Sequence, residues 1–266
     1  METKKFSTWN EFEEYALKKM DEANTKTSKD FYRPIFRGQA NADWSLKTTL
    51  DRVRERYDAF DYIEIIFSIK NKLETFTQQK WDGLNDPNKI FDDFHPDEYL
   101  GNPKSYPYML YLRHHGFPSP LLDWSLSPYI AAYFAFREGT KCKEVAIYTL
   151  CRMPAETDVP SRYRIHVTEH NVTTTPRHVL QQAIYTYCFD HGAPHEAQMG
   201  VFYDDHEKDT TNTYEIKKCI LPYSEREKVL TKLDRMNINA FSLFNSEEGL
   251  CEMLSIDSFV LQKFTI

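Results

Sequence analysis

Glycine is scarce in this chain, and its spacing restricts the folds that the chain can adopt. The 266 residues contain 8 glycines, or about 3% against a usual ~7%. The two closest, Gly192 and Gly200, lie eight residues apart. The G-x-G-x-x-G motif, the P-loop and the G-x-S-x-G elbow all need closer glycines. The sequence therefore disfavours a dinucleotide Rossmann fold of the usual kind, a P-loop ATPase and the common esterase fold.

The cysteines and histidines exclude the common zinc motifs. Five cysteines lie nine or more residues apart, and the nine histidines form no H-E-x-x-H. No C-x-x-C exists, so zinc ribbons and thioredoxin motifs are excluded. We expect no metal, and we expect reduced, mostly buried thiols in a cytoplasm. The cysteines are Cys142, Cys151, Cys188, Cys219 and Cys251.

The termini and the net charge narrow the expected location and partners. Residues 1–12 contain no apolar segment typical of a signal peptide. No run of about 18 apolar residues occurs, so we expect no membrane partner and a cytoplasmic location. The net charge is −7, which argues against broad electrostatic binding of DNA or RNA.

Aromatic residues are the one compositional excess, at 15% of the chain. The simpler interpretation is a core and surface built with large rings. The functional interpretation is a pocket lined for a planar ligand such as a base or nicotinamide.

Hydrophobic periodicity and caps predict alternating helices and strands. The capping box Thr8-Trp9-Asn10-Glu11 begins the first helix, and Ser224 to Glu227 begins another. Ser127-Pro128 begins a third, with serine at the N-cap. Residues 83–107 predict a loop, and the sequence leaves open whether it forms a lid. The predicted helices also cover 58–80, 108–115 and 247–254, and the predicted strands cover 35–37, 144–150, 179–187 and 214–221.

The order of these elements favours one α+β domain. Helices and strands mix without a regular βαβ rhythm, which indicates small mixed or antiparallel sheets flanked by helices. We place a helical extension at residues 1–29, the domain at 30–256 and a tail at 257–266.

Phe36-Arg37-Gly38-Gln39 is the first of three segments that packing alone does not explain. An arginine at the end of a short strand, beside a glycine, can direct a bidentate cation at a phosphate or carboxylate. The alternative is a structural clamp, with Arg37 paired to a carboxylate such as Asp123.

The second segment covers residues 111–135 and combines histidines with a helix N-terminus, which favours anions. It could position a histidine base, a ribose hydroxyl or a phosphate. Alternatively, the three residues are structural: Ser127 caps the helix, Asp123 forms an ion pair and Trp124 packs in the core. Adjacent histidines make a poor metal site. Its candidate residues are His114, His115, Asp123, Trp124, Ser125 and Ser127.

The third segment runs from Arg177 to Tyr185 and contains two adjacent glutamines. On a strand, Gln181 and Gln182 would face opposite sides, so one would face inward or into a cleft. A buried glutamine needs hydrogen-bond partners. It would be either a structural hydrogen-bonder or a group that reads a substrate.

Together the three segments resemble the FRG domain family over residues 30–255. Phe36-Arg37-Gly38 stands where the family has its Phe-Arg-Gly. Three departures occur: Ser119-Pro120 replaces a usual Thr-Arg, Arg113 a glutamine and Ala183 a glycine. The further matches are His115-Gly116, Leu121 to Trp124, Ser127-Pro128, Ala132 to Ala135, Arg177, Gln181, Tyr185, Leu243-Phe244 and Gly249-Leu250.

A weaker resemblance links Ser125 to Pro128 with the serine turn of ADP-ribosyltransferases. It implies an ADP-ribosyltransferase-like core that binds NAD as a substrate. Arg37, Ser125 and Gln181 would then hold the catalytic positions. Gln181 stands where that superfamily has a glutamate, and Glu169, Glu196 or Glu215 could substitute. The implied binding residues are Arg37, Gly38, Gln39, His114, His115, Asp123, Trp124 and Ser127.

Two functions from different classes follow. The first is an NAD-using enzyme of the ADP-ribosyltransferase or NAD glycohydrolase type. FRG domains in bacterial and phage-related proteins then imply a toxin or phage-defence effector with a protein target. The second is a non-catalytic module that uses the same cleft to bind a nucleotide or a protein. A metal-dependent nuclease, built on Glu215-Ile216-Lys217 and Asp204-Asp205, is a distant third.

Overall fold

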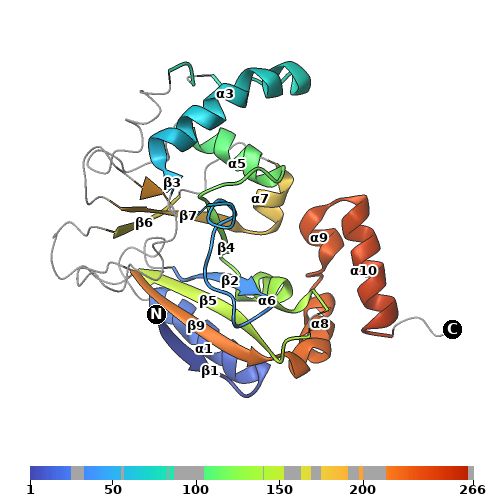
Figure 1. Cartoon of the computed structure of the whole chain (residues 1–266). Coiled ribbons are helices and arrows are strands. Elements are labelled where there is room, and N and C mark those ends of the chain that lie inside the picture. Colours follow the sequence, from blue (N-terminus) through green and yellow to red (C-terminus); the bar gives the residue numbers. More distant parts are fainter. Residues whose placement is uncertain are drawn as a thin grey trace.

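The computed structural model describes residues 1–24, 33–54, 57–82, 84–86, 105–139, 141–152, 163–168, 175–190, 198–199 and 214–262. Within them, strands and helices alternate irregularly around one sheet (Figure 1). The strands are β1 (Glu2–Lys5), β2 (Ile35–Gln39), β3 (Tyr57–Asp58), β4 (Leu122–Ser125), β5 (Glu144–Arg152), β6 (Tyr163–Val167), β7 (Ala183–Asp190), β8 (Gln198–Met199) and β9 (Tyr214–Pro222).

Helices cover the sheet and account for most of the remaining described chain. They are α1 (Trp9–Asn24), α3 (Ala59–Thr77), α5 (Tyr106–His114), α6 (Pro128–Phe136), α7 (Pro176–Leu180), α8 (Arg226–Arg235), α9 (Ala240–Phe244) and α10 (Glu247–Phe259), with a 3-10 turn η2 at Tyr223–Glu225. None of the described helices is long and apolar enough to cross a membrane.

The described strands form one nine-stranded sheet, which confirms the α+β class. Their order is β1-β9-β5-β2-β4-β7-β8-β3, with β6 beside β7. All the pairs are antiparallel except β1 with β9. We expected several small sheets. Instead, β2 pairs with both β5 and β4 and so joins two groups of strands into one sheet.

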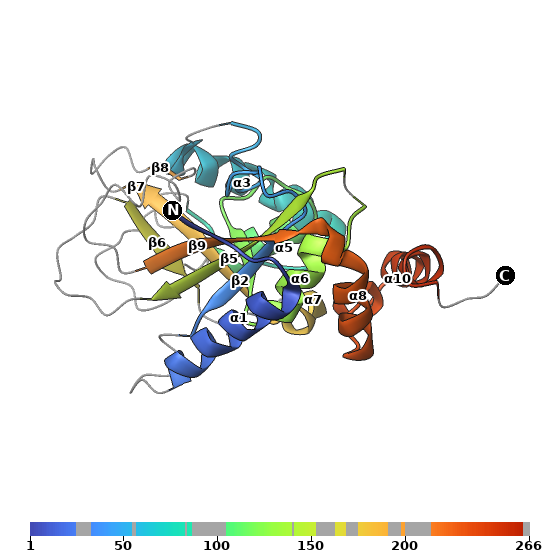
Figure 2. The same cartoon turned by 90° about the horizontal axis from the view of Figure 1, so that it is seen from below.

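Three buried clusters lie against the sheet, and two of them hold helices on it. The largest packs α1, α6 and α8 against the face of β5 and β9 that carries Val145 and Leu221. The second packs α3 and α5 against Tyr185 and Tyr187 of β7. The third lies on the opposite face, around Trp124. In both Figure 1 and Figure 2, α10 lies at the periphery beside the C-terminus.

Side-chain caps fix where several helices begin. Thr8 accepts a hydrogen bond from the Glu11 amide at 3.4 Å, as predicted for α1. Asp58 accepts from the Phe60 and Asp61 amides and caps α3. The capping box predicted at Ser224 is wrong: Ser224 lies in η2, and Glu225 is the N-cap of α8 without a side-chain cap.

The predicted strand at 179–187 is also wrong in its first half. Pro176 begins the short helix α7, which ends at Leu180, and β7 begins only at Ala183. Pro at the first helical position favours this helix. Gln181 is its C-cap, and Gln182 has a φ of 45°, so neither glutamine lies on a strand. The argument from opposite strand faces therefore fails for both.

Strands β1, β3, β4, β6 and β8 were not predicted. The predicted loop at 83–107 lies outside the described residues, apart from 84–86 and 105–107, as do the possible lid and the predicted tail beyond 262. No disulfide joins the five cysteines, of which Cys188 and Cys219 are buried and Cys251 is exposed.

Candidate functional site

Strands β2 and β4 are joined by fewer backbone pairs than the other long strands of the sheet. Only Phe36 and Ser125 are in register between these two strands, whereas β2 pairs with β5 along its whole length. Arg37 follows directly and donates from Nη1 to the carbonyl oxygen of Asp123 at 2.7 Å. We call the residues around this junction the seam: Arg37, Arg113, His114, Asp123, Ser125, Gln181 and Tyr185.

Gly38 is required by the helix that packs on β2. A Cβ added to Gly38 would lie 1.9 Å from the Ala131 carbonyl oxygen and 2.6 Å from the Ala135 amide nitrogen. Since both atoms belong to the α6 backbone, no side chain can move aside. Gly38 therefore sets the approach of α6 to the sheet. Ser127 caps α6 by accepting from the Ile130 amide, with Pro128 next to it, as predicted.

Asp123 and Arg113 form the main ion pair of the seam. Both Nε and Nη2 of Arg113 donate to the Asp123 carboxylate. The Arg113 side chain is 9% exposed and that of Asp123 is 44% exposed. Burial would raise the pKa of Asp123, but the charge and hydrogen bonds of Arg113, with Arg37 behind, outweigh burial and lower it. Asp123 is therefore a carboxylate at neutral pH.

Arg37 also lies beside this ion pair, so the predicted structural clamp between Arg37 and Asp123 is present in part. Its Nη1 lies 3.8 Å from Oδ2 of Asp123, and its side chain is 15% exposed. The direct hydrogen bond, however, goes to the Asp123 backbone. Arg113 is the principal partner of the carboxylate, and the sequence marked it only as a departure from the family pattern.

His114 faces the seam, and His115 faces outward. The Nε2 of His114 lies 2.9 Å from the Tyr185 hydroxyl, and its Nδ1 lies 2.9 Å from the Thr175 hydroxyl. Burial, aided by the charge of Arg113, lowers the pKa of His114 to about 4. The imidazole is therefore neutral at pH 7. His115 is exposed and lies against the Tyr111 ring, 4.3 Å between centroids.

The serine turn and Gln181 meet through hydrogen bonds. Ser125 Oγ donates to the Gln181 carbonyl oxygen at 2.8 Å and accepts from the Ser127 amide at 3.1 Å. Gln181 donates from Nε2 to the Leu243 carbonyl oxygen at 3.2 Å. Gln182 is exposed. Gln181 therefore ties the turn before β7 to α9.

Two candidates lie away from the seam. Trp124 is 3% exposed, packs in the cluster on the opposite face and donates from Nε1 to the Thr186 hydroxyl at 2.8 Å. Gln39 is 5% exposed and donates to the Ser45 carbonyl oxygen at 3.4 Å. Of the alternatives predicted for Trp124, this placement matches packing.

No metal centre forms among the residues that the structure describes, where no three His, Cys, Asp or Glu side chains gather to hold an ion. Lys217 lies 3.0 Å from carboxylate oxygens of both Glu215 and Glu2. Burial would lower the pKa of Lys217, but these carboxylates raise it. Asp204-Asp205, Glu169 and Glu196 lie outside the described residues.

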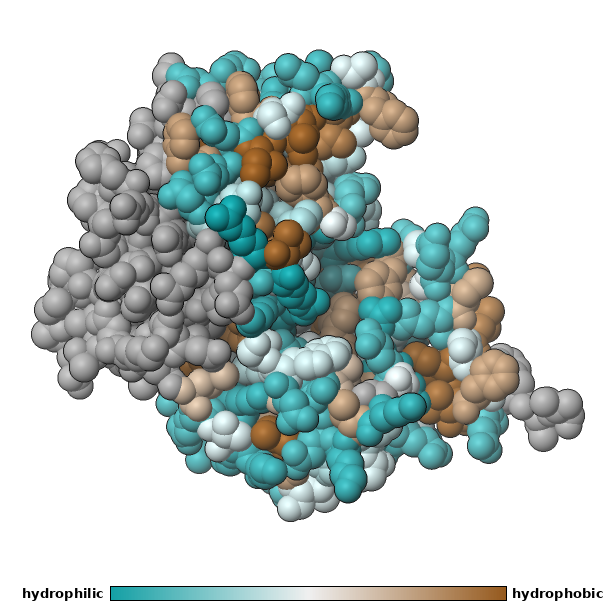
Figure 3. All heavy atoms as spheres, viewed as in Figure 1, coloured by the Kyte–Doolittle hydropathy of each residue, from teal (hydrophilic) through white to brown (hydrophobic). Residues whose placement is uncertain are grey.

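The surface is hollowed beside these elements. Figure 3 shows a notch between the part of the molecule that carries α3 and α5 and the part that carries α9 and α10. Arg177, at the start of α7, lies 5.5 Å from the centre of the Phe244 ring in α9. The charge of Arg177 also helps to lower the His114 pKa. Among the described residues, Arg37, Arg113 and Arg177 thus lie at or near the seam with Asp123, and Arg177 also lies near the Glu248 carboxylate.

Comparison with known proteins gives one match. Residues 32–144 match the family model of the FRG domain, from just before β2 to the first residue of β5. The comparisons with curated proteins and with solved structures found no match.

Proposed function

Since this chain carries an FRG domain, we propose that its seam binds an anionic nicotinamide dinucleotide, NAD, as in ADP-ribosyltransferase-like proteins. One observation carries the proposal. The three positions that the resemblance selects, Arg37, Ser125 and Gln181, are up to 144 residues apart in the chain. They lie on β2, on β4 and directly before β7, three neighbouring strands.

The charges of the seam support an anionic ligand. Arg37 and Arg113 present two guanidinium groups, and Asp123 offsets one of them. Guanidinium groups bind phosphate oxygens in bidentate fashion. Among the described residues of the seam, two guanidinium groups thus lie beside one carboxylate, which suits a pyrophosphate.

Hydroxyl and imidazole groups supply the neutral partners. Tyr185, Thr175 and neutral His114 form one hydrogen-bonded row. Such groups donate to or accept from ribose hydroxyls and an amide without adding charge. Since Tyr185 is 2% exposed, we assign the sugar and nicotinamide half of the ligand to His114 and Thr175 of this row, and the pyrophosphate to Arg37.

Gln181 limits the chemistry. Cleavage of the nicotinamide–ribose bond develops positive charge, which a fixed carboxylate would stabilise. Gln181 is neutral, and its side-chain amide is engaged by Leu243. Asp123 is ionised, but Arg113 offsets its charge. These contacts favour tight binding with slow or no cleavage, so a non-catalytic nucleotide-binding module is the second candidate.

A thermal-shift titration with NAD, ADP-ribose and ATP tests the binding. A ligand that binds only folded protein raises Tm by mass action. We expect NAD and ADP-ribose to raise the Tm of the wild type and to have little effect on Arg37→Gln. Arg152→Gln, which removes a guanidinium from over the Tyr214 ring, is the matched control and should respond like the wild type.

Release of nicotinamide separates the two candidates. Chromatography of NAD incubated with the full chain would show free nicotinamide if the seam is catalytic. Binding without release supports the module. Absence of any Tm shift with NAD and ADP-ribose would overturn the proposal itself.

A further inference from the structure

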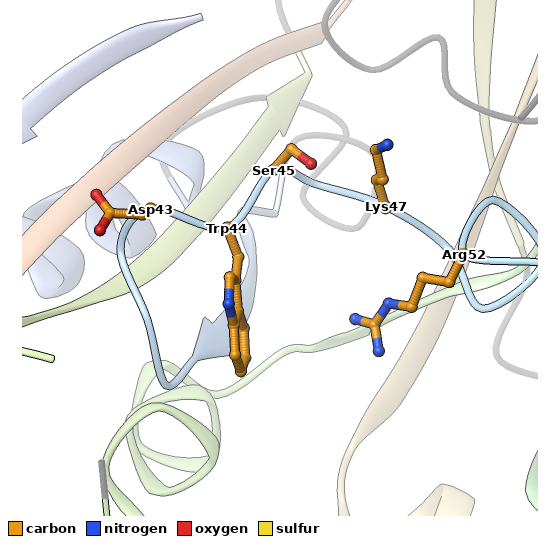
Figure 4. A pocket seen from close by; sticks show the side chains of 5 residues that line it. All are labelled: Asp43, Trp44, Ser45, Lys47 and Arg52. Carbon is orange, nitrogen blue, oxygen red and sulfur yellow. The ribbon is translucent and has the colours of Figure 1, made fainter. Parts of the chain in front are cut away.

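A separate pocket lies on the loop that follows β2. Its volume is about 450 Å³, and Figure 4 shows the residues that line it: Asp43, Trp44, Ser45, Lys47 and Arg52. The volume falls within the range of small-molecule sites, ~300–1,000 Å³. None of these residues belongs to the seam or to the three segments whose sequence suggests chemistry.

Trp44 gives this pocket an open aromatic face. Its side chain is 49% exposed, whereas Trp9, Trp81 and Trp124 are 1%, 6% and 3% exposed. The chain has 4 tryptophans, so Trp44 is the exposed one. Within the described part of the chain, no other ring stacks on its indole. A half-exposed indole beside cationic groups is typical of a surface that binds planar ligands.

The fold holds Trp44 in this exposed position. Its carbonyl oxygen accepts hydrogen bonds from the Tyr148 hydroxyl at 3.0 Å and from Lys218 Nζ at 3.5 Å. Ala42 and Leu46, on either side, are 5% and 1% exposed and pack into the core. The loop is therefore anchored at three points around the indole. A surface organised in this way loses little conformational entropy when it binds a ligand.

Arg52 is fixed at the other side of the pocket by a turn. The Thr48 amide donates to Oδ2 of Asp51 at 2.7 Å, and the Asp51 amide donates to Oγ1 of Thr48 at 3.1 Å. Arg52 follows this reciprocal pair and is exposed. In Figure 4 its guanidinium and the Trp44 indole extend to the same side of the loop. The pocket therefore offers an aromatic surface and a cation to one ligand.

The remaining charges give the pocket a polarity. Lys47 also lines the pocket, but in Figure 4 its side chain extends to the opposite side of the loop from Trp44 and Arg52. The Asp43 carboxylate is drawn beyond Trp44 and points away from Arg52 (Figure 4). A phosphate monoester carries a charge of about −1.5 to −2 at pH 7, and a guanidinium group such as that of Arg52 binds it in bidentate fashion. The anionic end of a ligand would therefore lie toward Arg52.

We infer that this pocket is a binding site for a nucleoside monophosphate, with its base stacked on Trp44 and its phosphate bound by Arg52. The site is distinct from the seam and does not depend on the dinucleotide proposed there. Stacking on an indole accepts any base, because every base has a π face. The pocket would therefore select the phosphate more strongly than the base.

Tryptophan fluorescence of the full chain tests this inference, because Trp44 is the exposed tryptophan. AMP should quench part of the emission with a saturable curve, and adenosine should bind more weakly. Arg52→Gln should weaken AMP binding about tenfold, the typical value of one charge-assisted hydrogen bond, and should leave adenosine unchanged. Trp44→Ala, measured by calorimetry, should lose both ligands.

Arg54→Gln is the matched control. Arg54 lies near Arg52 in the chain, but its guanidinium is over the Tyr57 ring, 5.2 Å from its centre, and it does not line the pocket. This variant should bind AMP like the wild type. The inference is overturned if AMP gives no saturable quenching, or if Arg52→Gln and Arg54→Gln weaken AMP equally.

Arg37→Gln distinguishes this pocket from the seam. It should retain quenching by AMP, whatever becomes of its response to NAD. Loss of the AMP signal in Arg37→Gln would assign the nucleotide to the seam and overturn a second site.

Discussion

Arg37 donates a hydrogen bond from Nη1 to the carbonyl oxygen of Asp123 at 2.7 Å, directly beyond the single registered pair of β2 and β4. The Arg37 side chain thus adds a hydrogen bond to a junction in which only one pair of residues is in backbone register. The same contact places the guanidinium beside the Asp123 carboxylate, at 3.8 Å. Arg37 therefore contributes both to the junction in the sheet and to the candidate ligand site.

Gly38→Ala should destabilise the protein by about 3 kcal/mol or more, because the new methyl group would overlap the α6 backbone. Gly139→Ala is the matched control, since a Cβ at Gly139 has no atom within 4 Å. Urea unfolding of the two variants measures the difference. Equal stability of both would show that α6 does not approach β2 as closely as described.

Asp123→Asn should cost about 2 kcal/mol of unfolding free energy. The change leaves Arg113, 9% exposed, with its charge no longer balanced. The cost is smaller than for a fully buried pair, because Asp123 is 44% exposed. The double variant Asp123→Asn, Arg113→Met should recover part of the loss in a double-mutant cycle.

The lowered pKa of Asp123 also predicts that the stability of the folded protein falls in acid. Its pKa is lower in the folded protein than the ordinary value of 3.8. Its contribution to stability is therefore fully present above about pH 4 to 5 and is lost as the pH falls through the folded pKa. Acid unfolding followed by circular dichroism should show a flatter profile for Asp123→Asn below pH 4.

The lowered pKa of His114 predicts a second pH range in which stability changes. Folding lowers its pKa from 6.5 to about 4, so the unfolded chain binds a proton that the folded protein does not. Stability is therefore complete above about pH 6.5 and falls, by roughly 2 kcal/mol, as the pH drops toward 4. His114→Gln should flatten urea-unfolding free energies in this window, whereas His115→Gln, at an exposed site, should keep the slope.

Gln181→Ala should lower stability by about 1 kcal/mol, because the Leu243 carbonyl loses its side-chain donor. Gln181→Glu should cost at least as much, since a carboxylate cannot donate that hydrogen bond. Thermal unfolding compares the two with a control at the neighbouring Gln182. Gln182 is exposed but has a φ of 45°, so the control is made as Gln182→Asn, which tolerates this backbone region.

The sequence predicted those elements whose local signals agree with the tertiary structure. Ser127-Pro128 predicted the start of α6, because a cap and a fixed φ act locally. The FRG pattern likewise led to a seam around Arg37 and Asp123. The prediction of a strand through Gln181 and Gln182 is wrong, because Pro176 begins a helix and the chain turns at Gln182.

Other elements had no readable local signal. Strand β1 consists of four exposed polar residues, Glu2–Lys5, and exists because it pairs in parallel with β9. The pairing of Arg113 with Asp123 depends on α5 and β4 meeting in space. Trp44 was one aromatic residue among 39 (18 Phe, 17 Tyr and 4 Trp), and only its exposure sets it apart.

The narrow contact of β2 with β4 gives the sheet two kinds of rigidity. Within β1, β9, β5 and β2, and again within β4, β7 and β6, runs of backbone pairs fix the geometry. Between the two groups, one backbone pair is supplemented by the side chain of Arg37, which bonds the Asp123 carbonyl oxygen. The junction of the two halves thus depends on one side chain, so we expect a substitution of Arg37 to loosen it while each half keeps its own strand register.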